Sequence, residues 1–214
     1  MQCWNLAANR SVSRRAGVLC EGNSGVAASE ADLLETFRGT VRVLESCNID
    51  YAVIGGLARA AWGRVRATTD VDITISADAA ALATTKRALE RAGFHVEDIV
   101  AGDEHDARPD IFAATLLNRV RVDFLVAKTP FEQEAMARRQ RIELLGETTY
   151  VVSVEDLVFY KLLATRPRDW DDVLDVLETQ THAGRIIDWV YLERHAGDWG
   201  INETLARLRR ELPQ

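Results

Sequence analysis

The sequence predicts a mixed α/β or α+β fold with a helical C-terminal half, and three observations support this. Strand-like apolar runs alternate with helical periodicity between residues 29 and 127, and helical periodicity dominates afterwards. The chain has 214 residues, 47% hydrophobic and 28% charged, which suits a globular protein with a sizeable core. No apolar run approaches the roughly 20 residues that cross a bilayer, so we expect a soluble protein without a membrane partner.

Three segments organise the chain. Residues 1–28 are rich in Gly, Ser, Asn and Ala without periodicity, so we expect a flexible extension. Residues 29–127 are expected to form the core, and residues 128–214 a mainly helical region packed on it. The twin arginines of "SVSRRAGVLCEG" precede too short an apolar stretch for a signal peptide. The chain's three cysteines lack C-x-x-C spacing, so we expect a reducing cytoplasm and no disulfide framework.

The individual elements follow from hydrophobic periodicity and from residues that begin or end helices. Ser29 is a suitable N-cap for the first helix, and Gly93 a suitable stop for the third. Within "VRVDFLV", Asp123 alternates with Val122 and Phe124, so it faces away from them. Up to residue 93 we expect, in chain order, a helix at 29–47, a strand at 50–56, a helix at 57–65, a strand at 70–76 and a helix at 77–93. A strand at 94–100, a polar loop at 101–110 and two strands within 111–127 follow. The remainder is expected to form a helix after Pro130, a strand pair around Gly146 and at least three further helices.

Two aspartates interrupt the strand "DVDITIS". Asp70 and Asp72 point to the same face, about 7 Å apart along the strand. Because like charges repel and unpaired burial is costly, a hard divalent cation such as Mg²⁺ is the usual solution. Asp123, on a nearby strand, is a candidate third carboxylate. Three such groups suit two Mg²⁺ ions about 3.5–4 Å apart, which favour in-line phosphoryl displacement. The alternative is that Asp70 caps a turn and Asp72 simply faces solvent.

Two adjacent glycines stand between a strand and a helix. Gly55 and Gly56 open that helix, where free N–H groups and the helix dipole attract phosphate. Glycine also permits close approach of a triphosphate to the backbone. The alternative is an ordinary turn. Together with the aspartates, the glycines predict one site, with phosphates in one half and metal ions in the other.

The stretch "IGGLARAAWGRVRATTDVDI" resembles the signature of the nucleotidyltransferase fold of the DNA polymerase beta superfamily. More narrowly, it resembles the AbiEii/MenT-type toxin branch, in which G-G-x-A precedes R-x-T-x-D-x-D. The matching residues are Gly55, Gly56, Ala58, Arg66, Thr68, Asp70 and Asp72. The resemblance implies a mixed sheet flanked by helices, metal binding by both aspartates and a third acidic residue, for which Asp123 is the best match.

A second block, "SVEDLVFYKLLATRPRDWDDVLDVLE", has Ser153 and Asp156 in a capping-box pattern that begins a helix. Lys161 lies along the apolar stripe of this helix, where the residues alone favour a side chain that extends to solvent. The toxin branch has a similar K-L-x-A-x-R-x-x-D-x-x-D block, which implies that Lys161 lies near the nucleotide phosphates. Asp169 and Asp172 match its acidic residues, and their alternative role is favourable charge in the first turn of the next helix.

The resemblance implies a Mg²⁺-dependent nucleotidyltransferase that uses a nucleoside triphosphate, with phosphates against Gly55, Gly56, Arg66 and Lys161. It also implies a toxin that acts on tRNA 3′ ends or on a protein, under the control of an antitoxin. A small-molecule acceptor, as in antibiotic-modifying enzymes, is a second hypothesis, which the pI of about 5.2 favours and the clustering of arginines opposes. These basic clusters are Arg64/Arg66, Arg138/Arg139/Arg141, Arg166/Arg168 and Arg207/Arg209/Arg210. A non-catalytic nucleotide-binding or antitoxin-like module is a third.

Overall fold

The computed structural model describes residues 28–65, 67–100, 111–117 and 119–212, in two compact units. The first unit spans Ala28–Ser153 and the second begins at Val154. The predicted extension at 1–28 lies outside the described residues except for Ala28, and so does the predicted loop at 101–110. The predicted boundary between residues 127 and 128 falls inside the first unit, because the strand pair that follows it belongs to that unit's sheet.

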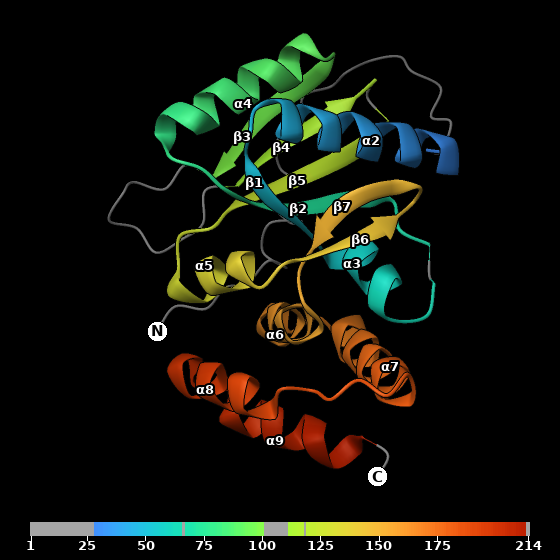
Figure 1. The fold of residues 1–214 in the computed structure, drawn as a ribbon, viewed down its shortest axis with the longest axis vertical. Coiled ribbons are helices and arrows are strands. Elements are labelled where there is room, and N and C mark those ends of the chain that lie inside the picture. The colour runs from blue at the N-terminus through green and yellow to red at the C-terminus, as the bar shows by residue number, and fades with distance from the viewer. Residues whose placement is uncertain (1–27, 66, 101–110, 118, 213–214) are drawn as a thin grey trace. The chain divides into compact units, whose positions relative to one another are not determined.

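The first unit holds all seven predicted strands and confirms the mixed α+β fold (Figure 1). Its elements are α2 (Glu30–Ser46), β1 (Asp50–Ile54), α3 (Gly55–Trp62), β2 (Asp70–Ser76), α4 (Ala79–Arg91), β3 (Phe94–Val100), β4 (Ile111–Leu116), β5 (Val120–Val126), α5 (Pro130–Ala137), β6 (Gln140–Leu144) and β7 (Glu147–Val151).

These strands form one mixed sheet in the order β3-β4-β5-β2-β1-β7-β6. β2 is the central strand, parallel to β5 on one side and antiparallel to β1 on the other. β1 and β7 are parallel neighbours. The strand that carries the two aspartates therefore lies in the middle of the sheet, where both neighbours fix its register.

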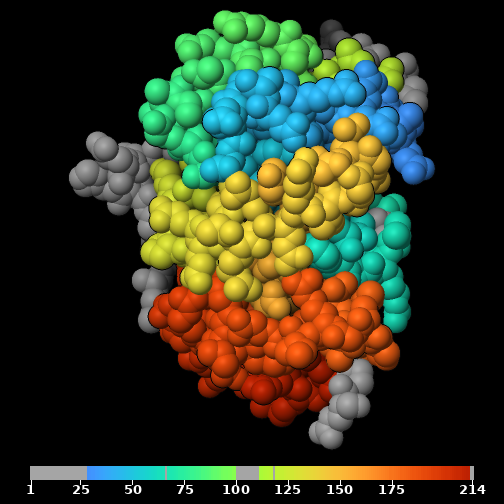
Figure 2. Space-filling view, viewed as in Figure 1, coloured from blue at the N-terminus to red at the C-terminus, as the bar shows by residue number. Residues whose placement is uncertain are grey.

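Helices α2 and α4 contact each other, and α2 packs on strands of the sheet (Figure 1). Ser29 caps α2 as predicted, with its hydroxyl accepting a hydrogen bond from the Asp32 backbone N–H at 3.2 Å. The apolar side of α2 buries Phe37, Val41 and Leu44. In the space-filling view the two helices lie next to each other on the surface of this unit (Figure 2).

Helix α5 begins at a capping box that Thr129 forms with Glu132. Oε2 of Glu132 accepts hydrogen bonds from the backbone N–H groups of Lys128 and Thr129 at 2.9 and 2.8 Å. The Glu132 side chain is nevertheless buried, and its Oε1 has no hydrogen-bond partner in the described part of the chain. Burial raises the pKa of this carboxyl above its ordinary 4.5, and the hydrogen bonds oppose that shift.

This raised pKa predicts a pH effect on stability. A raised pKa means that the folded state binds the proton more tightly than the unfolded state. The stabilisation by the proton is therefore complete below pH 4.5 and is lost as the pH rises through the folded-state pKa. Relative to Glu132→Gln, which does not titrate, wild-type protein should lose free energy of unfolding as the pH rises above 4.5. Urea unfolding at a series of pH values measures this difference, and parallel curves for the two proteins would contradict it.

The second unit is helical and comprises α6 (Val154–Ala164), α7 (Pro167–His182), α8 (Trp189–Trp199) and α9 (Asn202–Glu211). Helix α6 packs on α7 and α8, and α8 packs on α9. Every residue of α6 is buried, as expected of a helix that is apolar nearly all round. None of the described helices is long and apolar enough to cross a membrane.

Candidate active site

Three aspartates lie on one face of neighbouring strands. On β2, Val71 and Ile73 are fully buried whereas Asp70 and Asp72 are partly exposed, so the two aspartates share a face. On β5, Asp123 is the register partner of Asp72. Neighbouring strands are about 4.8 Å apart, and register partners project to the same side. The fold therefore brings the two aspartates of β2 beside a carboxylate fifty residues further along the chain.

The glycine pair lies directly against this face. Helix α3 starts at Gly55, which has φ +63°, and no side chain caps it. A Cβ at Gly55 would come within 2.0 Å of Oδ2 of Asp72, and one at Gly56 within 2.5 Å of Oγ1 of Thr68. A larger residue at either position would collide with the side chain of Asp72 or Thr68, so both positions require glycine. The carboxylate of Asp72 lies at the N-terminal turn of α3, where the helix dipole favours negative charge.

Replacing Gly55 with alanine should be strongly destabilising. The substitution costs backbone strain at positive φ and also forces the new methyl group into Asp72, about 2–4 kcal/mol in total. Gly200 is the matched control, because it has φ +69° and nothing within 4 Å of an added Cβ. Gly200→Ala should therefore show only the strain. Denaturant unfolding measures both variants, and an equal loss of stability would contradict a specific contact with Asp72.

Thr68, in the segment between α3 and β2, helps to orient Asp70. The Thr68 hydroxyl is 3.1 Å from Oδ1 of Asp70 and 3.3 Å from the Asp70 carbonyl oxygen. Trp62, at the end of α3, donates from Nε1 to the Val152 carbonyl at 2.8 Å, which joins α3 to the segment after β7. Arg66, predicted to bind phosphate, lies outside the described residues.

A cation already contacts the third aspartate. Nε of Arg121 donates to Oδ1 of Asp123 at 2.6 Å. Arg121 is also the register partner of Asp70 on β2. In the described part of the chain, no group of three or more His, Cys, Asp and Glu side chains is gathered as a metal-binding cluster. The carboxylate oxygens on this face are ligands that Mg²⁺ prefers, and the Arg121 guanidinium lies beside one of them.

In the helical unit, Lys161 forms a buried ion triad. Its ammonium donates to Oδ1 of Asp169 at 3.0 Å and to Oδ2 of Asp172 at 2.8 Å. Only 8% of Lys161 is exposed, so the expectation of a side chain that extends to solvent is wrong. Both aspartates are buried as well, and Oδ2 of Asp169 has no hydrogen-bond partner among the described residues. The two aspartates therefore do more than place charge in the first turn of α7.

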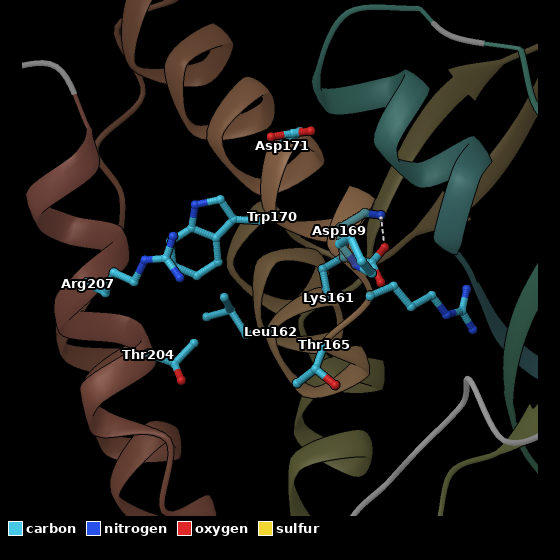
Figure 3. Close-up of a pocket in the computed structure, with 10 residues that line it drawn as sticks. Lys161, Leu162, Thr165, Asp169, Trp170, Asp171, Thr204 and Arg207 are labelled. Atoms are coloured by element: carbon cyan, nitrogen blue, oxygen red, sulfur yellow. Dashed lines mark hydrogen bonds and ion pairs between the residues drawn. The ribbon is translucent and has the colours of Figure 1, made fainter.

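A pocket of about 400 Å³ adjoins this triad within the helical unit (Figure 3). The ion pair of Lys161 and Asp169 lies on one side of it, and Trp170 with Arg207 on the other. The Arg207 guanidinium lies 4.3 Å from the centre of the Trp170 ring, and the indole N–H donates to Glu211 at 2.7 Å. These contacts hold the indole in one orientation at the pocket wall.

The sequence matches the family model described as "Nucleotidyl transferase of unknown function (DUF2204)" over residues 33–209. The chain belongs to this family. The match covers nearly all of both units, so the predicted assignment to nucleotidyltransferases is confirmed. No curated protein matches the sequence significantly.

Solved structures agree with this nucleotidyl transferase fold. The antibiotic-resistance factor ANT(2'')-Ia is similar with a TM-score of 0.58 and 15% identity, over 84% of this chain and 99% of that one. A nucleotidyltransferase-like protein from Paracoccidioides brasiliensis has a TM-score of 0.49 and 22% identity, over 71% and 77% of the two chains. At these identities the likeness to ANT(2'')-Ia establishes the fold alone.

Two features of this nucleotidyl transferase were missed at the sequence level. The first is the ion pair of Arg121 with Asp123, and the signal was available, because residues two apart on a strand share a face. The second is the triad of Lys161 with Asp169 and Asp172. Its signal is the spacing of the two aspartates, three apart on a helix and therefore on one side of it.

Proposed function

We propose that this nucleotidyl transferase moves a nucleoside monophosphate from a triphosphate to an acceptor hydroxyl, with divalent metal bound by Asp70, Asp72 and Asp123. The register pairing of Asp72 with Asp123, beside the start of α3, carries this proposal. It combines carboxylate ligands with a helix N-terminus that attracts phosphate.

The three aspartates on this side of the sheet, named the aspartate face, carry the oxygen ligands that Mg²⁺ prefers. Asp70, Asp72 and Asp123 offer carboxylate oxygens on one face, and all three side chains are partly exposed. When bound, the metal ions would polarise the α-phosphate and neutralise charge on the pyrophosphate leaving group. The prediction of two ions rests on the number of carboxylates.

The residues of this chain have distinct proposed roles. Asp123 accepts the proton of the acceptor hydroxyl, whose oxygen forms a bond to the α-phosphorus. The bond from that phosphorus to the bridging oxygen breaks, and pyrophosphate leaves with the electron pair. Backbone N–H groups at Gly55 and Gly56 face the phosphates, and Thr68 orients Asp70. The proposed phosphate contacts of Arg66 and Lys161 rest on the family resemblance, and so do the proposed nucleotide contacts of Thr68 and Asp169.

Two acceptor classes remain in the proposal. The resemblance to the toxin branch favours a tRNA 3′ end or a protein, with an antitoxin as partner and the cytoplasm as compartment. A small-molecule hydroxyl as the acceptor is favoured because arginines of the basic clusters form ion pairs with carboxylates. Arg139, Arg207 and Arg209 each form an ion pair with a carboxylate of their own unit. Paired arginines and a net charge of -7 leave less basic surface for RNA.

An assay of label transfer tests the activity and identifies the class of acceptor. Each nucleoside triphosphate, radiolabelled at its α-phosphate, is incubated with Mg²⁺ and the full chain in three arms: total tRNA, the protein alone, and a panel of hydroxylated antibiotics. Transfer to RNA should weaken steeply between about 50 and 200 mM salt, and transfer to a small molecule should not. Triphosphate binding by calorimetry without label in any arm would contradict a transferase and support a binding module.

A further inference from the structure

Arg121 contacts one aspartate of the aspartate face, Asp123, and is the register partner of another, Asp70. Its Nε donates to Asp123 on the same strand at 2.6 Å, and its register partner on β2 is Asp70. The side chain of Arg121 is 38% exposed and that of Asp123 is 26% exposed. The guanidinium therefore has access to solvent, while its charge acts on a partly desolvated carboxylate.

We propose that Arg121 is the built-in counter-cation of the aspartate face and makes metal binding depend on the triphosphate. In the free protein it holds Asp123 and opposes a divalent cation that arrives alone. When metal arrives with a triphosphate, Arg121 exchanges Asp123 for phosphate oxygens. This inference rests on the proposed function, because it assigns the metal to Asp123.

Charge balance gives this exchange its direction. A guanidinium and a divalent cation compete for the lone pairs of Asp123 and repel each other at short range. Arg121 therefore lowers the affinity of this site for a free metal ion. A triphosphate carries several negative charges, and guanidinium forms strong, often bidentate hydrogen bonds with phosphate. The same residue therefore opposes the free ion and favours the metal–triphosphate complex.

A purely orienting role would have the opposite consequence for free metal. Groups that hydrogen-bond to a metal-binding carboxylate fix its orientation, and their loss typically weakens metal affinity about 10–100-fold. If Arg121 only orients Asp123, its removal should weaken binding of the free ion. The sign of the change in Mn²⁺ affinity thus separates the two roles.

The experiment compares Arg121→Gln with Arg119→Gln in the full chain. Arg119 lies in the turn directly before β5, is exposed and pairs with Asp32, so its loss removes an arginine without touching the aspartate face. The probes are Mn²⁺ alone, followed by electron paramagnetic resonance, and Mn²⁺ with inorganic tripolyphosphate, followed by calorimetry. We expect Arg121→Gln to bind Mn²⁺ about tenfold tighter and Mn²⁺–tripolyphosphate about tenfold more weakly, the size expected for one charged hydrogen bond. Arg119→Gln should change neither affinity.

Arg121→Lys keeps the charge and should return both affinities toward wild type. If Arg121→Gln does not fold, Arg121→Met removes the same charge and should show the same two changes. Weaker or unchanged Mn²⁺ binding in Arg121→Gln would overturn the inference. Asp72→Asn and Asp123→Asn should each lose Mn²⁺ binding whatever Arg121 does. If both retained wild-type affinity, the proposed function would fail instead, so the two failures are distinguishable.

Discussion

Asp72→Asn should lower nucleotidyl transfer about 10³-fold while leaving the protein folded. Asparagine has nearly the same shape, so the contact with Gly55 is kept and only the charge is lost. Metal ions held by carboxylates supply several kcal/mol of transition-state stabilisation, and about 4 kcal/mol corresponds to 10³-fold. The rate of label transfer at saturating Mg²⁺ measures the effect.

Stability should change much less than activity. Asp72→Asn removes repulsion with its like-charged register partner Asp123, but it also removes a negative charge that the N-terminus of α3 favours. These two effects oppose each other, so the free energy of unfolding should stay within about 1 kcal/mol of wild type. Asp98→Asn is the matched control, because Asp98 lies on β3, is 65% exposed and pairs with Lys86. It should retain full transfer. Activity of Asp72→Asn within a few-fold of wild type would refute the metal assignment.

Local patterns predicted the elements and the faces of this fold, since strand alternation and helix periodicity are local properties. The alternation around Asp123 correctly placed it opposite Val122 and Phe124. The pairing of Asp72 with Asp123 was beyond local patterns, because it depends on β5 lying beside β2 and on the register between them. The strand pattern made Asp123 a candidate third carboxylate and the resemblance favoured it, and the strand order brings it beside Asp72.

The glycines show the same limit of prediction from local sequence patterns. The sequence indicates that Gly55 and Gly56 can take conformations that other residues avoid, and it suggested close approach of phosphate. It cannot say which side chains lie against them. The structure places Asp72 and Thr68 there, so glycine is required by the protein itself. Contact with phosphate stays a prediction.

Lys161→Met should destabilise the protein by about 3–5 kcal/mol. Methionine fills similar space but lacks the ammonium that serves Asp169 and Asp172 at 3.0 and 2.8 Å. Both aspartates are more than nine-tenths buried, and removing one partner of a buried ionic group leaves uncompensated charge. Urea unfolding followed by circular dichroism measures the loss, and a value within 1 kcal/mol of wild type would contradict it.

The triple variant Lys161→Met, Asp169→Asn, Asp172→Asn separates two roles of the lysine. Replacing a whole buried ionic group by neutral residues of similar size is often close to neutral for stability. The triple variant should therefore recover most of the stability that Lys161→Met loses. If Lys161 also contacts phosphate, as the family resemblance implies, transfer should stay low in the restored protein. Recovery of both stability and transfer would show that the lysine acts only by neutralising its two aspartates, because charge balance within the helices would then account for its whole effect.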